Sequence, residues 1–305
     1  MISIVSKYYN HINFFTLASL FAVVMNFIFN FSDSTVLINI LSFLLIASVG
    51  ITHGSYDIKK GQILSRFFNL KSIKLFLIMY IFVAMSIMAF WYLLPTITLL
   101  LFLIISIYHF GNEEFEYFNI KTNLFISIFR GLMIIIAPLV FHYEQTFKIF
   151  QSINFSINDK LFFFMSNNYT ILIIFALINI LFSLIVIGNN PSRFILLLDL
   201  LTLILINFIF EPIFSFSLYF CFLHSKRNIS KIRKYFLRLN NSNFNSVKWI
   251  SIITFSLFLI TLLFLFSRNQ ILFSINNTIF IGLAALTFPH ILTEFTFNKI
   301  IKEKI

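Results

Sequence analysis

The stretch Leu75–Leu94, LFLIMYIFVAMSIMAFWYLL, contains no charged residue and decides the fold class. A helix of about 20 apolar residues is long enough to cross the hydrocarbon core of a bilayer. Strands of a membrane barrel would alternate apolar and polar residues, which this stretch does not do. A second run of the same kind is Ile250–Phe266. Both stretches therefore predict transmembrane helices.

The composition of the whole chain extends this prediction. Of the 305 residues, 59% are hydrophobic and 11% are charged, and the mean hydropathy is +0.95. Soluble domains carry about 25% charged residues. We therefore expect an all-α, polytopic transmembrane bundle of about eight to ten spans, forming a single integral membrane domain over residues 1–305. The expected location is the cell membrane, inner or plasma.

Ten apolar segments are candidate spans, and the fourth and eighth of them are short. In chain order they are Asn13–Phe31, Thr35–Thr52, Ile73–Leu94, Thr96–Phe110, Asn123–Phe141, Tyr169–Ile187, Phe194–Phe210, Pro212–Leu223, Trp249–Phe266 and Ile271–Phe295.

The net charge of +11 belongs mainly to basic segments between these spans. Lys59–Lys74 and Lys226–Lys248 are interpreted as loops, and with ten spans they fall on the same side as both termini. By the positive-inside rule this side is cytoplasmic. The basic loops are expected to contact anionic membrane lipid and not nucleic acid. The single cysteine, Cys221, excludes an internal disulfide and a cysteine-based metal site.

Histidines are the polar residues whose placement is most informative. His11 precedes the first span and is interpreted as an interfacial residue, whereas His142 closes the fifth span. The remaining four lie at or near the ends of even-numbered spans: His53, His109, His224 and His290. Because such ends share one side of the membrane, these four imidazoles are expected at one depth.

Neutral imidazole is the commonest nitrogen ligand for iron, copper and zinc. Any one of these histidines alone is better explained as a helix-end or headgroup contact. Four at one level, in a chain with so few polar residues, predict a metal site.

Other polar residues stand close to these histidines. Asp57 and Glu294 each follow a histidine by four residues, so either carboxylate is a candidate acceptor for an imidazole N–H. A helix cap or a partner for nearby lysine and arginine explains them equally well. Three tyrosines beside the histidines are candidate substrate contacts, although aromatic residues make up 19% of the chain: Tyr56, Tyr108 and Tyr219.

Five short motifs occur in a fixed order along most of the chain. They are His53-Gly54-Ser55-Tyr56-Asp57, His109-Phe110-Gly111, Arg130-Gly131 with Pro138 and Phe141-His142, His224-Ser225-Lys226-Arg227, and Pro289-His290. Together they resemble the bacterial and archaeal β-carotene 15,15′-dioxygenases of the Brp/Blh type, which are polytopic and similar in length.

The resemblance implies Fe(2+) bound by His53, His109 and His224, with open positions for O2. It also implies a carotenoid substrate, cleaved at its central double bond to two retinal molecules, and a functional link to a retinal-binding protein. One family histidine is Asn228 in this chain. The fourth ligand is then expected to be a nitrogen of His290 or the side-chain oxygen of Asn228.

Three other functions remain open from the sequence. The loss of a family histidine at Asn228 fits a pseudo-enzyme that binds a carotenoid or retinal without cleaving it. Asp199 and Glu211, within or between apolar runs, fit a proton-coupled secondary transporter. A di-iron membrane oxygenase would need clustered histidine boxes, which this sequence does not contain.

Overall fold

The computed structural model describes residues 2–70, 72–118, 120, 123–153, 169–187, 193–239, 243–267 and 271–303. Within these ranges every regular element is a helix. The N-terminal part contains α1 (Ile2–Phe29), α2 (Thr35–Leu45), α3 (Asp57–Phe67), α4 (Ile73–Leu93) and α5 (Pro95–Tyr117). The middle contains α6 (Leu124–Gly131), α7 (Met133–Phe141), α8 (Tyr143–Ser152), α10 (Tyr169–Ile187) and α11 (Arg193–Ile209). The C-terminal part contains α12 (Pro212–Leu218), α13 (Lys226–Arg238), α14 (Asn245–Phe266) and α15 (Ile271–Glu303).

Local sequence explains several helix boundaries. Proline is favoured in the first turn of a helix and disfavours helical geometry in the preceding residue. Pro95 accordingly begins α5, and Leu94 before it has an extended φ of −139° that ends α4. Pro212 begins α12 in the same way. At the start of α6, the side chain of Asn123 accepts a hydrogen bond from the Ile126 N–H, as expected of an N-cap.

The predicted class of an all-helical, polytopic membrane protein is confirmed. Six helical segments of the described chain are long and apolar enough to cross a membrane: Thr35–Phe67, Ile73–Leu93, Pro95–Tyr117, Leu124–Phe141, Asn245–Phe266 and Ile271–Ile300. Two shorter apolar helices are Phe14–Phe29 and Phe194–Ile209. The cytoplasmic placement of the termini stays a prediction.

Several predicted boundaries are wrong because helices continue into charged sequence. The span expected to end at Thr52 continues as helix to Phe67, and the span expected to end at Phe110 continues to Tyr117. The segment Lys59–Lys74 is therefore not a loop over its whole length. Its first part belongs to α3, which contains the fully buried Lys60. Lys60 can lie within a buried helix because it contacts the carboxylates of Asp57 and Glu294 inside the bundle.

The eighth predicted span, Pro212–Leu223, is also different from expectation. It consists of the short α12 followed by a π-helical turn, Tyr219–Ser225, and nearly all its side chains are buried within the protein. The basic segment after it is the helix α13, which buries Arg227 and Asn228. The segment is thus an inner helix of the bundle and not a short lipid-facing span.

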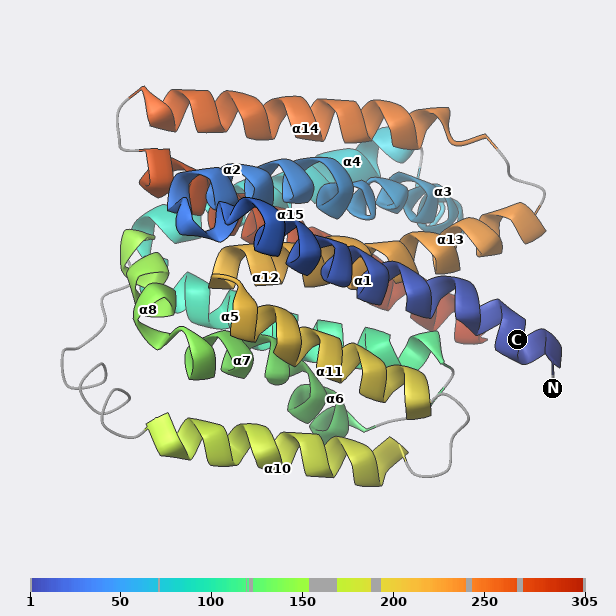
Figure 1. Cartoon of the computed structure of the whole chain (residues 1–305). Coiled ribbons are helices and arrows are strands. Elements are labelled where there is room, and N and C mark those ends of the chain that lie inside the picture. Colours follow the sequence, from blue (N-terminus) through green and yellow to red (C-terminus); the bar gives the residue numbers. More distant parts are fainter. Residues whose placement is uncertain are drawn as a thin grey trace.

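The long helices run side by side in an elongated bundle, with α14 and α10 at its two edges (Figure 1). α15 packs against α2, α3, α4 and α5, which brings the C-terminal part of the chain against the N-terminal part. Large apolar side chains are exposed on the outer helices, such as Phe82 on α4 at 71% and Ile260 on α14 at 61%. An apolar outer surface of this extent suits contact with lipid.

Two glycines allow α5 and α6 to approach unusually closely. A Cβ atom added at Gly111 would lie 1.8 Å from the Ser127 carbonyl oxygen. One added at Gly131 would lie 1.8 Å from the Ile107 carbonyl oxygen. Small residues at helix contacts permit this backbone-to-backbone packing in membrane proteins. The contact fixes the half of α5 that carries His109.

We predict that Gly111→Ala destabilises the protein by about 1–3 kcal/mol or more, because the new methyl group collides with backbone and not with a flexible side chain. Thermal unfolding of the purified protein in detergent would measure this. Gly54→Ala is the matched control, since a Cβ there meets no atom within 4 Å. Equal unfolding temperatures for the two variants would contradict the packing argument.

Candidate metal centre

Four buried imidazole rings form a closed cycle inside the bundle. The ring centroid of His53 lies 5.0 Å from that of His224 and 4.9 Å from that of His290. The centroid of His109 lies 5.3 Å from that of His224 and 5.5 Å from that of His290. Each ring comes from a different helical segment, and each residue is 3–6% exposed. The structure therefore brings together the four histidines that the sequence singled out.

Irregular helix turns present two of these rings. A π-helical turn, Ile46–Gly50, precedes His53, and a second one, Tyr219–Ser225, contains His224. Such turns occur often at functional sites because they redirect side chains. The two turns pack closely, since a Cβ added at Gly50 would lie 2.7 Å from the Phe220 ring. That ring in turn stacks on the His224 imidazole.

Three of the four imidazoles have a ring nitrogen without a hydrogen-bond partner in the part of the chain that the structure describes. The Nε2 atoms of His109, His224 and His290 are buried and make no hydrogen bond to any described residue. An unsatisfied buried polar atom costs about 1–3 kcal/mol. The fourth ring, His53, donates from Nδ1 to the Gly50 carbonyl, which leaves its Nε2 as the unprotonated nitrogen. This donor set fits a bound metal ion.

Carboxylates contact the Nδ1 atoms of two rings, those of His224 and His290. Nδ1 of His224 lies 2.9 Å from Oε2 of Glu113, and Nδ1 of His290 lies 2.8 Å from Oδ2 of Asp57. A carboxylate behind a metal-binding histidine fixes the ring orientation and tautomer. Glu113 also lies 3.8 Å from Nε2 of His109. One oxygen of Glu113 and one nitrogen each of His109 and His290 lie within 4.8 Å of one another, so Glu113 is itself a candidate ligand.

The carboxylates predicted from spacing are present but have different partners. Asp57 was a candidate acceptor for an imidazole N–H because it follows His53 by four residues, and the imidazole that donates to it is that of His290. The α-helical spacing fails because a tighter 3-10 turn, Gly54–Tyr56, separates Asp57 from His53. Glu294 lies 3.5 Å from Nε2 of His290 without a hydrogen bond, and its Oε2 accepts from Lys60 at 3.0 Å.

Asn228 lies behind the rings, between two carboxylates. Its side-chain N–H groups donate to Glu113 at 2.6 Å and to Glu294 at 3.3 Å. Its Oδ1 is buried and makes no hydrogen bond to the described part of the chain. In this arrangement Asn228 steadies Glu113, which in turn holds His224.

Two lysines balance the charge of these carboxylates. Nζ of Lys60, fully buried, lies 3.2 Å from Asp57 and 3.0 Å from Glu294. Nζ of Lys231 lies 3.0 Å from Glu116. Burial lowers the pKa of the Lys231 ammonium, but the Glu294, Glu116 and Glu113 carboxylates outweigh burial and hold that pKa above its usual value. Lys231 therefore stays charged beside these carboxylates.

Sequence reasoning missed Glu113 and Lys60. Glu113 follows His109 by four residues, the same spacing that identified Asp57 and Glu294 as candidates, so it carried an available signal. No sequence pattern identified Lys60, because a lysine in a basic segment is usually a solvated loop residue. His142 lies at the end of α7 and takes no part in the ring contacts described above. The side chain of His11 lies outside the residues whose burial is described.

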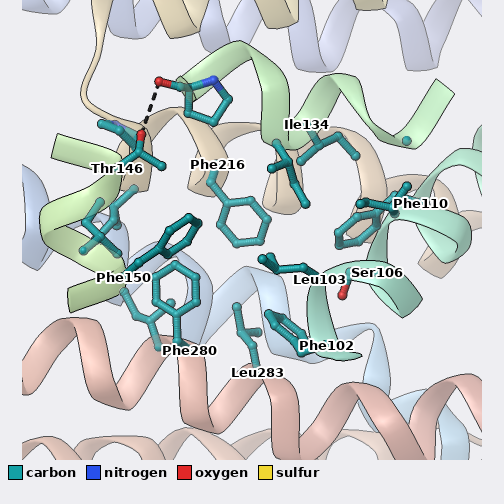
Figure 2. Close-up of a pocket in the computed structure, with 18 residues that line it drawn as sticks. Phe102, Leu103, Ser106, Phe110, Ile134, Thr146, Phe150, Phe216, Phe280 and Leu283 are labelled. Atoms are coloured by element: carbon teal, nitrogen blue, oxygen red, sulfur yellow. Dashed lines mark hydrogen bonds between the residues drawn. The ribbon is translucent and has the colours of Figure 1, made fainter. Parts of the chain in front are cut away.

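An apolar cavity lies on one side of the rings. Figure 2 shows Phe102, Leu103, Phe110, Phe216 and Leu283 among the side chains that face it. The cavity volume is about 90 Å³. Phe110 forms part of its wall, and the ring of Phe110 also lies 4.6 Å from that of His224. The cavity therefore reaches the layer next to the histidines.

The three tyrosines predicted as substrate contacts do not line this cavity. The hydroxyl of Tyr219 donates to Glu114, 3.2 Å away, and its ring packs on Phe110. Tyr108 is half-buried, and Tyr56 packs against Phe244 on another side of the bundle. The cavity wall is formed by phenylalanine and aliphatic residues, which adjacency to a histidine in the sequence does not identify.

Comparison with known proteins identifies the family of this chain. The family model described as Beta-carotene 15,15'-dioxygenase matches residues 44–296, a range that contains all four histidines of the cycle. A beta-carotene 15,15'-dioxygenase from an uncultured marine bacterium, 66A03, is 28% identical over 267 residues, which cover 83% of this chain and 92% of the relative. No solved structure matches the chain. The match over most of the chain, together with the motifs in their order, shows that this protein belongs to the beta-carotene 15,15'-dioxygenase family, as the resemblance predicted.

Proposed function

We propose that the chain is an iron(II)-dependent dioxygenase that cleaves the central double bond of a carotenoid within the membrane. His53, His109, His224 and His290 are the proposed ligands. Membership of the family favours this enzyme activity over a transporter. The product of β-carotene cleavage would be two retinal molecules, and a retinal-binding protein is the proposed functional partner.

The closed cycle of four imidazoles carries the proposal. Buried imidazole nitrogens without hydrogen-bond partners are costly in an apolar bundle, and a shared cation removes that cost. Neutral nitrogen ligands suit iron(II) and leave positions for O2. Bound iron(II) would supply the O2 chemistry that no side chain of this chain can perform.

The protein's own residues orient the ligands and exclude water. Asp57 and Glu113 fix the rings of His290 and His224 through their Nδ1 atoms. Phe110 and Phe220 pack against the His224 ring and close the site toward the apolar interior. A dry, fixed arrangement needs little reorganisation during the reaction. Asn228 supports this order by donating a hydrogen bond to Glu113.

The apolar cavity is the proposed place for the polyene. Most of its wall, including Phe102, Phe216 and Leu283, offers apolar contact to a hydrocarbon chain. Its polar side chains are Ser106 and Thr146. A carotenoid dissolved in the bilayer can reach such a cavity between helices without passing through water. One C=C bond and one O2 give two C=O groups, so the reaction needs no further reductant and no acid or base.

We expect iron to bind to the purified protein in about equal molar amount and to be lost when a ring is removed. His109→Ala should lower bound iron at least about tenfold, because it removes a ligand and leaves the cycle open. Elemental analysis after metal loading measures this without reference to activity. His142→Ala is the control, and a similar loss of iron in that variant would argue against the assigned ligands.

Cells that make β-carotene provide the test of the reaction. Expression of the chain should bleach the pigment and produce retinal, and His224→Ala should abolish both effects at equal membrane expression. Chromatography of extracted pigments gives the readout. Unchanged pigment with iron-loaded protein in the membrane would support the carotenoid-binding pseudo-enzyme instead.

Blocking the cavity should separate substrate binding from metal binding. Leu283→Trp places a large ring in the cavity wall, so we expect cleavage to fall at least about tenfold while iron content is kept. Leu292→Trp on the same helix is the matched control, because Leu292 is 56% exposed on the outer surface. Equal activity of the two variants would show that the polyene lies elsewhere.

A further inference from the structure

A second pocket lies on another side of the bundle, where α13, the start of α14 and the 3-10 turn Gly54–Tyr56 meet. Residues of its wall that matter here are Tyr56, Arg233, Phe244, Asn245, Lys248 and Ile252. It shares no residue with the apolar cavity. The proposed dioxygenase reaction does not use it.

The charge of this pocket is positive and unbalanced. Arg233 and Lys248 are both exposed, and neither forms an ion pair with a described residue. No aspartate or glutamate lines the pocket. The Arg233 guanidinium and the Lys59 amino group also lie 5.9 Å and 5.5 Å from the centre of the Phe244 ring. An anion in the pocket would therefore meet several cationic groups.

A polar side chain is also part of the wall. The Tyr56 residue is 7% exposed and lines the pocket, and its hydroxyl is not among the buried side-chain atoms that lack a hydrogen-bond partner, so it is open to a ligand. The first turn of α14 begins at Asn245, so the positive end of that helix dipole faces the same place. A hydroxyl donor, two cations and a helix N-terminus are a donor set suited to phosphate oxygens.

Neighbouring residues put the pocket at the edge of the membrane. Trp249 on α14 is 65% exposed, and tryptophan is enriched at the level of lipid headgroups. Ile252, one turn further along α14, lines the pocket and is 54% exposed. The pocket thus joins a basic, hydrogen-bonding end to an apolar, lipid-facing wall.

We propose that this pocket binds the phosphate of an anionic phospholipid, with the acyl chains lying along Ile252. Free inorganic phosphate carries the same chemical group. The apolar wall of the pocket and the exposed Trp249 favour a lipid over the free anion. Basic pockets between membrane helices bind anionic headgroups in this way. Phosphatidylcholine is a poorer ligand because its cationic choline group would lie beside Arg233 and Lys248.

Quenching of Trp249 fluorescence tests the proposal on the full-length protein in vesicles, with Trp91→Phe in every variant so that Trp249 is the remaining tryptophan of the sequence. A small fraction of brominated phosphatidylglycerol in unlabelled phosphatidylcholine should quench more than the same fraction of brominated phosphatidylcholine. Arg233→Gln combined with Lys248→Gln should reduce the preference about tenfold. Tyr56→Phe, which keeps the charge, should reduce it by about twofold to tenfold.

Lys234→Gln combined with Arg238→Gln is the matched control, because both residues are exposed on the same helix and neither lines the pocket. An equal loss of preference in this control would overturn the proposal in favour of general attraction to basic residues. Equal quenching by the two brominated lipids would also overturn it. If inorganic phosphate at matched ionic strength protects the detergent-solubilised protein from heat as well as phosphatidylglycerol does, the ligand is the free anion and the lipid assignment is wrong.

Discussion

The need to satisfy polar groups inside an apolar bundle governs this structure. With 11% charged residues, the chain still buries Asp57, Lys60, Glu114 and Arg130, and each of these has a charged partner within the protein. In lipid there is no water to replace such a partner. Three imidazole nitrogens of the histidine cycle stand out for this reason, because they are buried and make no hydrogen bond to the described part of the chain.

The imidazoles converge because helices approach closely at a few small residues. Gly111 and Gly131 bring α5 and α6 into backbone contact, and Gly50 allows the two π-helical turns to pack. These contacts place His109, His53 and His224 at one level. Behind them, Glu113 and Asp57 contact rings that belong to other helices, so that the orientations of His224 and His290 depend on elements distant in the sequence.

Asn228, where the family resemblance implies a histidine, lies behind the histidine cycle. His290 closes the cycle between His53 and His109, while Asn228 bridges Glu113 and Glu294 behind it. An amide in that position donates to two carboxylates at once, which reduces their mutual repulsion. The cycle therefore contains four imidazoles without a histidine at position 228.

The sequence by itself determined the helical membrane class, the four histidines and the family, because apolar length, residue type and motif order are local properties. It also predicted the apolar core of most helices, from Ile73–Leu93 to Asn245–Phe266. It could not predict that Lys60 is buried, that Asp57 binds His290 and not His53, or that phenylalanines such as Phe216 and not the three tyrosines line the cavity. Only the tertiary structure decided these points, since a side chain's partner depends on helix irregularities and on contacts between segments more than 200 residues apart, as for Asp57 and His290.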